Sequence, residues 1–166
     1  MRREIPTRLI AVAIAVGSLL ALPLSGSSPA VVVSSSSCKK LVSPPPVLIN
    51  KVLTSKSTVS ACTPLAKTGG SGKSVTKIGI KVGGKTVTVS TTTWAGGKGT
   101  TIATLTYKTS PKLGNCPTGT TLRVTATGIV TGGTNKLIKK GEIETATVCV
   151  AKNSSATLAP GTTWKF

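Results

Sequence analysis

Two short segments in the middle of the chain alternate apolar and polar residues, and a pair of glycines separates them. In residues 75–82 the two isoleucines fall on one side of an extended chain, and Lys77 and Lys81 fall on the other. Gly83-Gly84 follows, and residues 85–90 alternate again. Alternation with a period of two around a Gly-Gly pair is the pattern of a tight β-hairpin, which the sequence therefore predicts here.

Most of the remaining chain has the same character. Thr and Val dominate it, and both branch at Cβ, which favours extended backbone. Glycine-rich turn signals separate further expected strands, at residues 47–53, 58–62, 100–108, 120–130 and 143–150. Short, regularly spaced strands without helical periodicity predict an all-β fold, namely an antiparallel β-sandwich of immunoglobulin-like architecture, with a small β-barrel as the alternative. The core would be aliphatic, with Trp94 and Trp164 as core or edge plugs.

The N-terminal region has the layout of a secretory signal. A basic start precedes the apolar residues 9–24, and small residues follow up to Ala30. This apolar run of 16 residues is shorter than the ~20 that a membrane span requires. We therefore expect a signal peptide at 1–30, a flexible leader with a Pro-rich crossing at 31–46, and the β-sandwich domain at 47–166. The mature protein would have no membrane span and would be secreted, extracellular or in the cell envelope.

Four cysteines follow the expected signal peptide. An even number in an exported chain predicts two disulfides, and three pairings are possible. We favour Cys38–Cys62 and Cys116–Cys149, because each pair closes a short loop that contains a plausible pair of strands. A zinc site is disfavoured, because the chain has no Cys-x-x-Cys pair and no histidine. We expect no metal and no cofactor.

The order of cysteines and turns resembles that of a known family. The segments that carry the likeness are Cys38-Lys-Lys-Leu, Cys62-Thr-Pro, Thr68-Gly-Gly-Ser-Gly72, Thr93-Trp-Ala-Gly-Gly-Lys98, Cys116-Pro-Thr-Gly119, Gly128-Ile-Val-Thr-Gly-Gly133, Cys149-Val and Leu158-Ala-Pro-Gly-Thr162. The chain resembles small, exported, Thr/Gly-rich, four-cysteine β-proteins of actinobacterial type. The resemblance implies a β fold and export. It implies no activity and transfers no catalytic or binding residue.

The charge of the chain is strongly one-sided. After residue 30 it has 17 lysines and Arg123 against two glutamates, which leaves a net charge of about +16. Such a field attracts polyanions, so an anionic cell-wall polymer or polysaccharide is a candidate partner, with Lys136, Lys139 and Lys140 as the best local cluster. Sequence-specific binding to nucleic acid is disfavoured, because arginine and aromatic side chains are scarce. The alternative is that lysine on outer faces serves solubility.

The chain contains no His, Asp or Gln, so it lacks the residues that most catalytic mechanisms require. Residues 79–86 match the letters of a phosphate-binding P-loop, but they continue as a strand and not as a helix, so we interpret them as the hairpin. Glu142 and Glu144 could mimic a glycosidase pair, yet we interpret them as a solvated acidic pair near Lys139 or Lys140. We expect an exported, non-enzymatic protein with a structural or interaction role; polyanion binding and an extracellular hydrolase are the alternatives.

Overall fold

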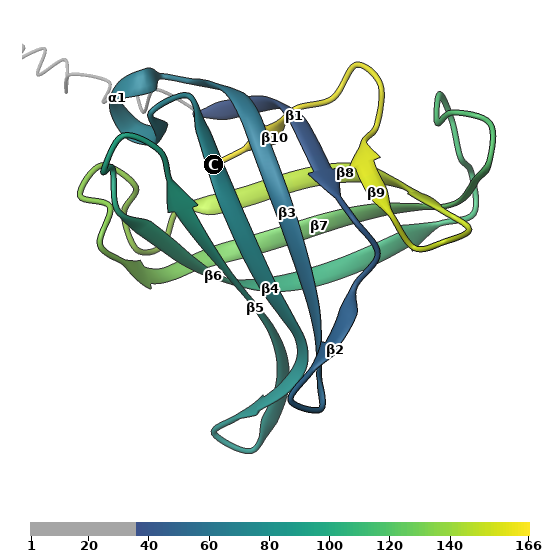
Figure 1. The fold of residues 1–166 in the computed structure, drawn as a ribbon, viewed down its shortest axis with the longest axis horizontal. Helices are drawn as coiled ribbons and strands as arrows, with labels where there is room; N and C mark the ends of the chain where they lie inside the picture. The colour runs from purple at the N-terminus through teal and green to yellow at the C-terminus, as the bar shows by residue number, and fades with distance from the viewer. Residues whose placement is uncertain (1–35) are drawn as a thin grey trace, which may run out of the picture. The chain divides into compact units, whose positions relative to one another are not determined.

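The computed structural model describes residues 36–166, so the expected signal peptide at 1–30 lies outside the described residues. Figure 1 shows strands that wrap around a common interior. The elements are β1 (Ser37–Ser43), β2 (Val47–Ile49), β3 (Val52–Thr63), α1 (Leu65–Thr68), β4 (Ser71–Val82), β5 (Lys85–Trp94), β6 (Thr100–Ser110), β7 (Thr120–Gly133), β8 (Ile143–Ala151), β9 (Ala156–Leu158) and β10 (Trp164–Lys165).

The strands form one antiparallel sheet that closes on itself through β1. Along one edge β1 pairs with β3, for example Val42 with Thr58; along the other it pairs with β9, where Val42 meets Thr157, and with β10. Both β9 and β10 also pair with β8, so together they fill one position of the ring. The result is a closed eight-stranded barrel. The expected immunoglobulin-like sandwich, which needs two separate sheets, does not form.

The hairpin and the long strands follow the sequence pattern. Val82 pairs with Lys85 across the Gly83-Gly84 turn, which confirms the hairpin and excludes a helix after Lys85. The strands expected at 100–108, 120–130 and 143–150 are β6, β7 and β8, each slightly longer than predicted. The expected strands at 47–53 and 58–62 are wrong in their bounds. The chain turns at Asn50 and Lys51, both at positive φ, and β3 then runs without a break.

The barrel begins earlier in the chain than the sequence indicates. Residues 37–43 were expected in a flexible leader, but they form β1, and Cys38 on this strand is fully buried. This strand has no clear apolar/polar alternation in the sequence, because it contains serines and two exposed lysines and few apolar residues. Residues 44–46, the prolines, connect β1 with β2 outside any strand, as their missing N–H groups require.

Aromatic rings fill one end of the barrel. Trp94 lies 5.9 Å from Trp164 and 5.0 Å from Phe166, measured between ring centroids. All three rings are buried and pack with Val59 and Val130, which confirms the expected role of the tryptophans as plugs. The helix α1 lies at this end, where the Asn135 side chain donates to the carbonyl of Lys67 at 2.7 Å. This end of the barrel is therefore closed.

Two disulfides form, in the pairing that the loop lengths favoured. Cys38 bonds to Cys62 between neighbouring strands β1 and β3, inside the buried core. Cys116, in the connection between β6 and β7, bonds to Cys149 on β8. Within the described part of the chain, no helix has the length and apolar character needed to cross a membrane.

Candidate functional site: a cavity inside the barrel

The interior of the barrel is hollow at the end away from the aromatic plug. The cavity has a volume of about 380 Å³. An eight-stranded barrel is just wide enough for its side chains to fill the interior, or for one small ligand to occupy it. Here many inward positions carry only small side chains, among them Ser55, Ser57, Ala126, Gly128 and Ala146. The cavity exists because these side chains are too small to fill the interior of the barrel.

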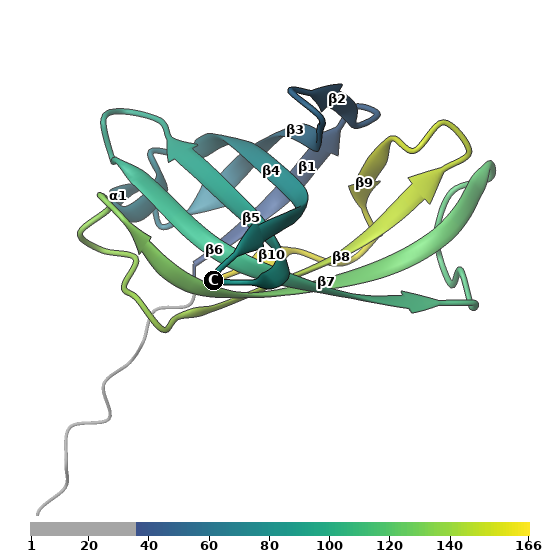
Figure 2. The same ribbon diagram turned by 90° about the horizontal axis from the view of Figure 1, so that it is seen from below.

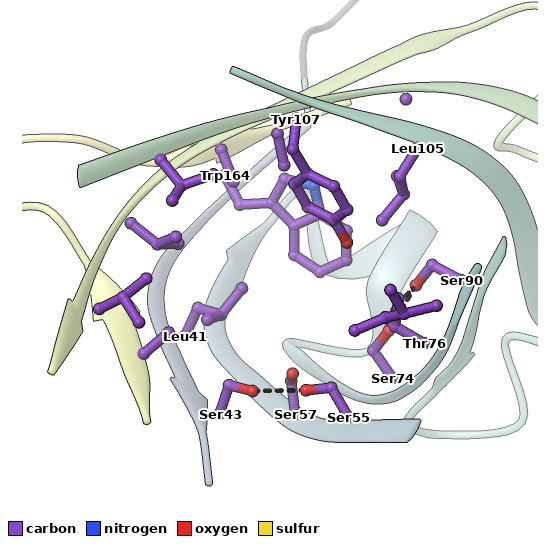
Figure 3. Close-up of a pocket in the computed structure, with 18 of the residues that line it drawn as sticks. Leu41, Ser43, Ser55, Ser57, Ser74, Thr76, Ser90, Leu105, Tyr107 and Trp164 are labelled. Carbon is purple, nitrogen blue, oxygen red and sulfur yellow. Dashed lines mark hydrogen bonds between the residues drawn. The ribbon is translucent and has the colours of Figure 1, made fainter. Parts of the chain in front are cut away.

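The lining has a hydroxyl wall and an apolar wall. The adjacent strands β1, β3, β4 and β5 contribute the hydroxyl wall, which consists of Ser43, Ser55, Ser57, Ser74, Thr76 and Ser90. Opposite them, β6, β7 and β8 contribute an apolar wall of Leu105, Val124, Ala126, Ala146, Val148 and Val150. In Figure 3 Ser43, Ser55 and Ser57 lie across the open space from Tyr107.

The hydroxyls of the first wall bond largely to one another. Ser43 Oγ and Ser55 Oγ are 2.7 Å apart, and so are Ser74 Oγ and Ser90 Oγ. The Thr76 hydroxyl donates to Ser90 Oγ at 3.2 Å. A hydroxyl has one donor and two acceptor positions, so these pairs keep acceptor capacity for a bound molecule. Five of the six hydroxyls of this wall are therefore hydrogen-bonded, and the wall can still bind polar groups.

Trp164 forms the floor of the cavity, and loops surround the other end. The indole N–H of Trp94, beneath the floor, donates to Thr101 Oγ1 at 2.7 Å, which holds the plug in place. At the far end the lining includes Pro46, Thr109 and Ser154, which lie at or beyond the ends of their strands. Figure 2 shows β2 and β9 standing apart at this end of the barrel.

Glu144 is the only residue with an ionisable carboxyl among those that line the cavity. It lies on the inward face of β8, and only 5% of its surface is exposed. Burial raises the pKa of Glu144 to about 7. Burial, and to a smaller extent the negative charge of Glu144, also raise the pKa of the Tyr107 phenol. The two side chains therefore interact within one weakly polar space.

The structure separates the two glutamates that the sequence placed together. Glu142 precedes β8, and its Oε1 accepts a hydrogen bond from the backbone N–H of Lys139 at 3.1 Å. Glu144 instead lines the cavity, so the expectation of a solvated pair is wrong for this residue. The two carboxyls do not flank a shared space, as a glycosidase pair must. Their i, i+2 spacing does not put both on the inward face, because Glu142 lies outside the strand.

The predicted lysine cluster lies on the outside of the molecule. Lys136, Lys139 and Lys140 are exposed in the single loop that connects β7 with β8. None of the lysines, nor Arg123, lines the cavity. The disulfide cysteines are structural and also lie away from it, and among residues 36–166 no three His, Cys, Asp or Glu side chains gather as a metal site.

The sequence did not reveal the cavity, and it named Glu144 only as one of a solvated acidic pair. One signal was present, because Glu144 occupies the same alternate positions as Ala146, Val148 and Val150, which marks it as inward-facing. The hydroxyl wall had no such signal, since Ser at inward positions looks like Ser on a solvated face. No protein-family model, no curated protein and no solved structure matches this chain. Function must therefore be inferred from the geometry of the cavity.

Proposed function

We propose that this protein is an exported, non-enzymatic binding protein whose barrel holds one small, largely apolar molecule. The observation that carries the proposal is the cavity of about 380 Å³ between the hydroxyl wall and the apolar wall. Cavities that bind small ligands have volumes of roughly 300 to 1,000 Å³ and combine an apolar lining with a few polar groups. The two disulfides and the expected signal peptide support export.

The small inward side chains support binding over a purely structural role. A barrel selected for stability alone would fill its interior, because each missing methylene forfeits packing energy. Exposed apolar side chains also lie beside the open end, where Leu48 pairs with Leu53 and Leu53 pairs with Ile78 of the lining. An apolar ligand could contact this row as it enters.

The test fills the cavity and leaves the outside of the barrel unchanged. Ala126→Leu places a larger side chain in the cavity, whereas Thr127→Leu on the next, exposed position of β7 is the matched control. The probe is N-phenyl-1-naphthylamine, a neutral apolar fluorophore, and Trp164 provides a second fluorescence signal from the floor. We expect Ala126→Leu to weaken binding about tenfold or more and Thr127→Leu to leave it unchanged. Absence of saturable binding to the unmodified protein would overturn the proposal.

A second candidate function uses the outer surface. Three lysines, Lys136, Lys139 and Lys140, are exposed together on one loop, which favours contact with an anionic polymer such as a wall polymer or acidic polysaccharide. This function and the cavity do not exclude each other, because the lysines lie in the loop between β7 and β8 and none of them lines the cavity. Binding to the polymer would hold the protein in the cell envelope.

A further inference from the structure

We propose that the molecule bound in this cavity is an organic cation, with a protonated amine joined to an apolar body, and that Glu144 is the counter-ion of the amine. This inference rests on the proposed binding function and narrows it to one class of ligand. Its starting point is the position of Glu144, a residue that is only 5% exposed and lines the cavity. Among the described residues, Glu144 has no hydrogen-bonding or ion-pairing side chain as a partner.

A buried carboxyl group without a partner is unexpected in a chain that contains so many lysines. Buried carboxylates in proteins are normally paired with a cation or hydrogen-bonded, because removing the charge from water costs several kcal/mol. The chain has 17 lysines, and none of them lines the cavity. A protein with so many cations could neutralise Glu144 with a single inward lysine. The carboxyl is therefore left open on the side of the cavity, where a ligand can supply the positive charge.

Gly128 makes room for the Glu144 side chain in the wall of the cavity. Gly128 pairs with Glu144 across β7 and β8, and a Cβ atom on Gly128 would lie 2.7 Å from Glu144 Cγ and 2.9 Å from Oε1. The same Cβ would lie 2.6 Å from Cδ2 of Leu105. The Glu144 side chain thus occupies space that exists only because residue 128 is glycine. A carboxyl that is positioned before binding loses little conformational entropy when a cation arrives.

Aromatic rings line the same space. Tyr107 interacts electrostatically with Glu144, and Trp164 forms the floor of the cavity. Figure 3 shows the side chains of Tyr107 and Trp164 extending into the space above Ser43, Ser55 and Ser57. The faces of Tyr and Trp rings attract organic cations, most strongly where water is excluded. Trp164 is buried, whereas Tyr107 is 47% exposed, so the stronger attraction is expected at Trp164. A carboxylate with two aromatic rings nearby suits an alkylammonium group, whereas an anionic ligand would meet a second negative charge.

The rest of the lining fits the remainder of such a ligand. The aliphatic side chains of Val124, Ala126, Val148 and Val150 can contact an apolar body. The hydroxyl wall can accept hydrogen bonds from N–H groups that do not reach Glu144. The lysines lie on the outside in water, and they repel a cationic ligand. At a salt concentration near 0.15 M this repulsion is screened over a Debye length of ~8 Å. The lysines therefore slow the approach of the ligand more than they weaken its ion pair with Glu144.

The test compares three probes of the same shape: 1-adamantanamine, 1-adamantanol and adamantane-1-carboxylate. At pH 8.5 the amine is charged and Glu144 is ionised, so we expect the amine to bind about ten to a hundred times more tightly than the alcohol, and the carboxylate to bind most weakly. Glu144→Gln should remove the preference for the amine and keep the binding of the alcohol. Glu142→Gln is the matched control and should keep the preference.

A second measurement needs no variant. Leu105 and Gly128 pack against Glu144, and Tyr107 is the only other titratable residue in the lining. Between pH 8.5 and 5.5 only Glu144 among these groups gains a proton, so the preference for the amine should fall about tenfold or more. Equal affinity of amine and alcohol, or a preference that survives Glu144→Gln, would overturn the cation inference while leaving the binding function intact. If none of the probes binds, and N-phenyl-1-naphthylamine also fails, both are wrong.

Discussion

Glu144 lies over Gly128, its partner on the neighbouring strand, so closely that no other residue could replace this glycine without displacing the carboxyl. Gly128 does not have positive φ, so backbone conformation does not require glycine there. The requirement is steric, and it comes from the side chains of Glu144 and Leu105. Gly128 and Glu144 therefore form one structural unit in the wall of the cavity.

Gly128→Ala should destabilise the protein by about 1 to 3 kcal/mol, because the new Cβ would overlap Glu144 Cγ and Leu105 Cδ2. The same substitution at Gly132 is the control, since this glycine is on the same strand, has no positive φ, and has nothing within 4 Å of its added Cβ. Denaturant unfolding measures both changes in the free energy of unfolding. Equal losses at the two positions would show that the close approach at Gly128 has no energetic consequence.

The stability of the protein should fall as the pH rises from about 5 to 8. The folded state holds the Glu144 proton up to a pKa of about 7, whereas the unfolded chain releases it near the ordinary value of 4.5. The contribution of this proton to stability is therefore complete below pH 4.5 and lost as the pH passes 7, a change of about 3 kcal/mol. With no His and no Asp in the chain, few other groups titrate in this range.

Urea unfolding at several pH values measures this dependence. Glu144→Gln should make the free energy of unfolding nearly independent of pH between 5 and 8, because the amide does not titrate. Glu142→Gln should leave the slope in place, since the Glu142 carboxyl lies in the loop and accepts a hydrogen bond from Lys139. A slope that persists in Glu144→Gln would assign the pH dependence to another group.

Removing the Cys38–Cys62 disulfide should cost more stability than removing Cys116–Cys149. The bonded cysteines are 24 and 33 residues apart, so loop closure alone predicts similar losses, about 3 to 4 kcal/mol each. Cys38 and Cys62 also belong to the buried core beside the aromatic plug, whereas Cys116 lies in a partly exposed connection. Double Ala variants of each pair, unfolded without reductant, test this order. Unchanged stability in either double variant would contradict the structural role of that disulfide.

Neutralising the exposed loop should weaken binding to polyanions and reduce its dependence on salt. In the triple variant Lys136→Gln, Lys139→Gln and Lys140→Gln, fewer counter-ions are released from the polymer, so the salt slope should become shallower. The control replaces Lys73, Lys77 and Lys81 of β4 by Gln, which removes the same charge from another face. Equal losses in both variants would mean that only net charge matters and that the loop is not a site.

The β-strands were predictable because alternation and turn residues are local properties. The hairpin around Gly83-Gly84 follows from neighbouring residues alone, and the long strands β6, β7 and β8 lie where the Thr/Val pattern places them. β1 was not predictable, since its inward face combines a cysteine, a leucine and a serine and shows no apolar stripe. Its role depends on β3 and β9, which lie on its two sides and far from each other in the sequence.

The candidate site was predictable only in part. Lys136, Lys139 and Lys140 were expected at the surface, because taking a charged side chain out of water is costly. Glu144 shares the alternate positions of Ala146 and Val148, so its inward direction was present in the pattern, but the space it faces was not. That space depends on which small residues of separate strands meet across the interior.

Three properties follow from the amino-acid sequence alone: the chain forms antiparallel strands, its four cysteines join in two pairs, and its outer surface is positively charged. Only the tertiary structure decided that the sheet closes into a barrel and encloses a cavity with one carboxyl group. The reason is physical: the strand pattern is the same in a sandwich and in a barrel, because both bury one face of each strand. Closure depends on the pairing of β1 with β3 and β9, and the cavity on side-chain volumes summed across strands that are distant in sequence.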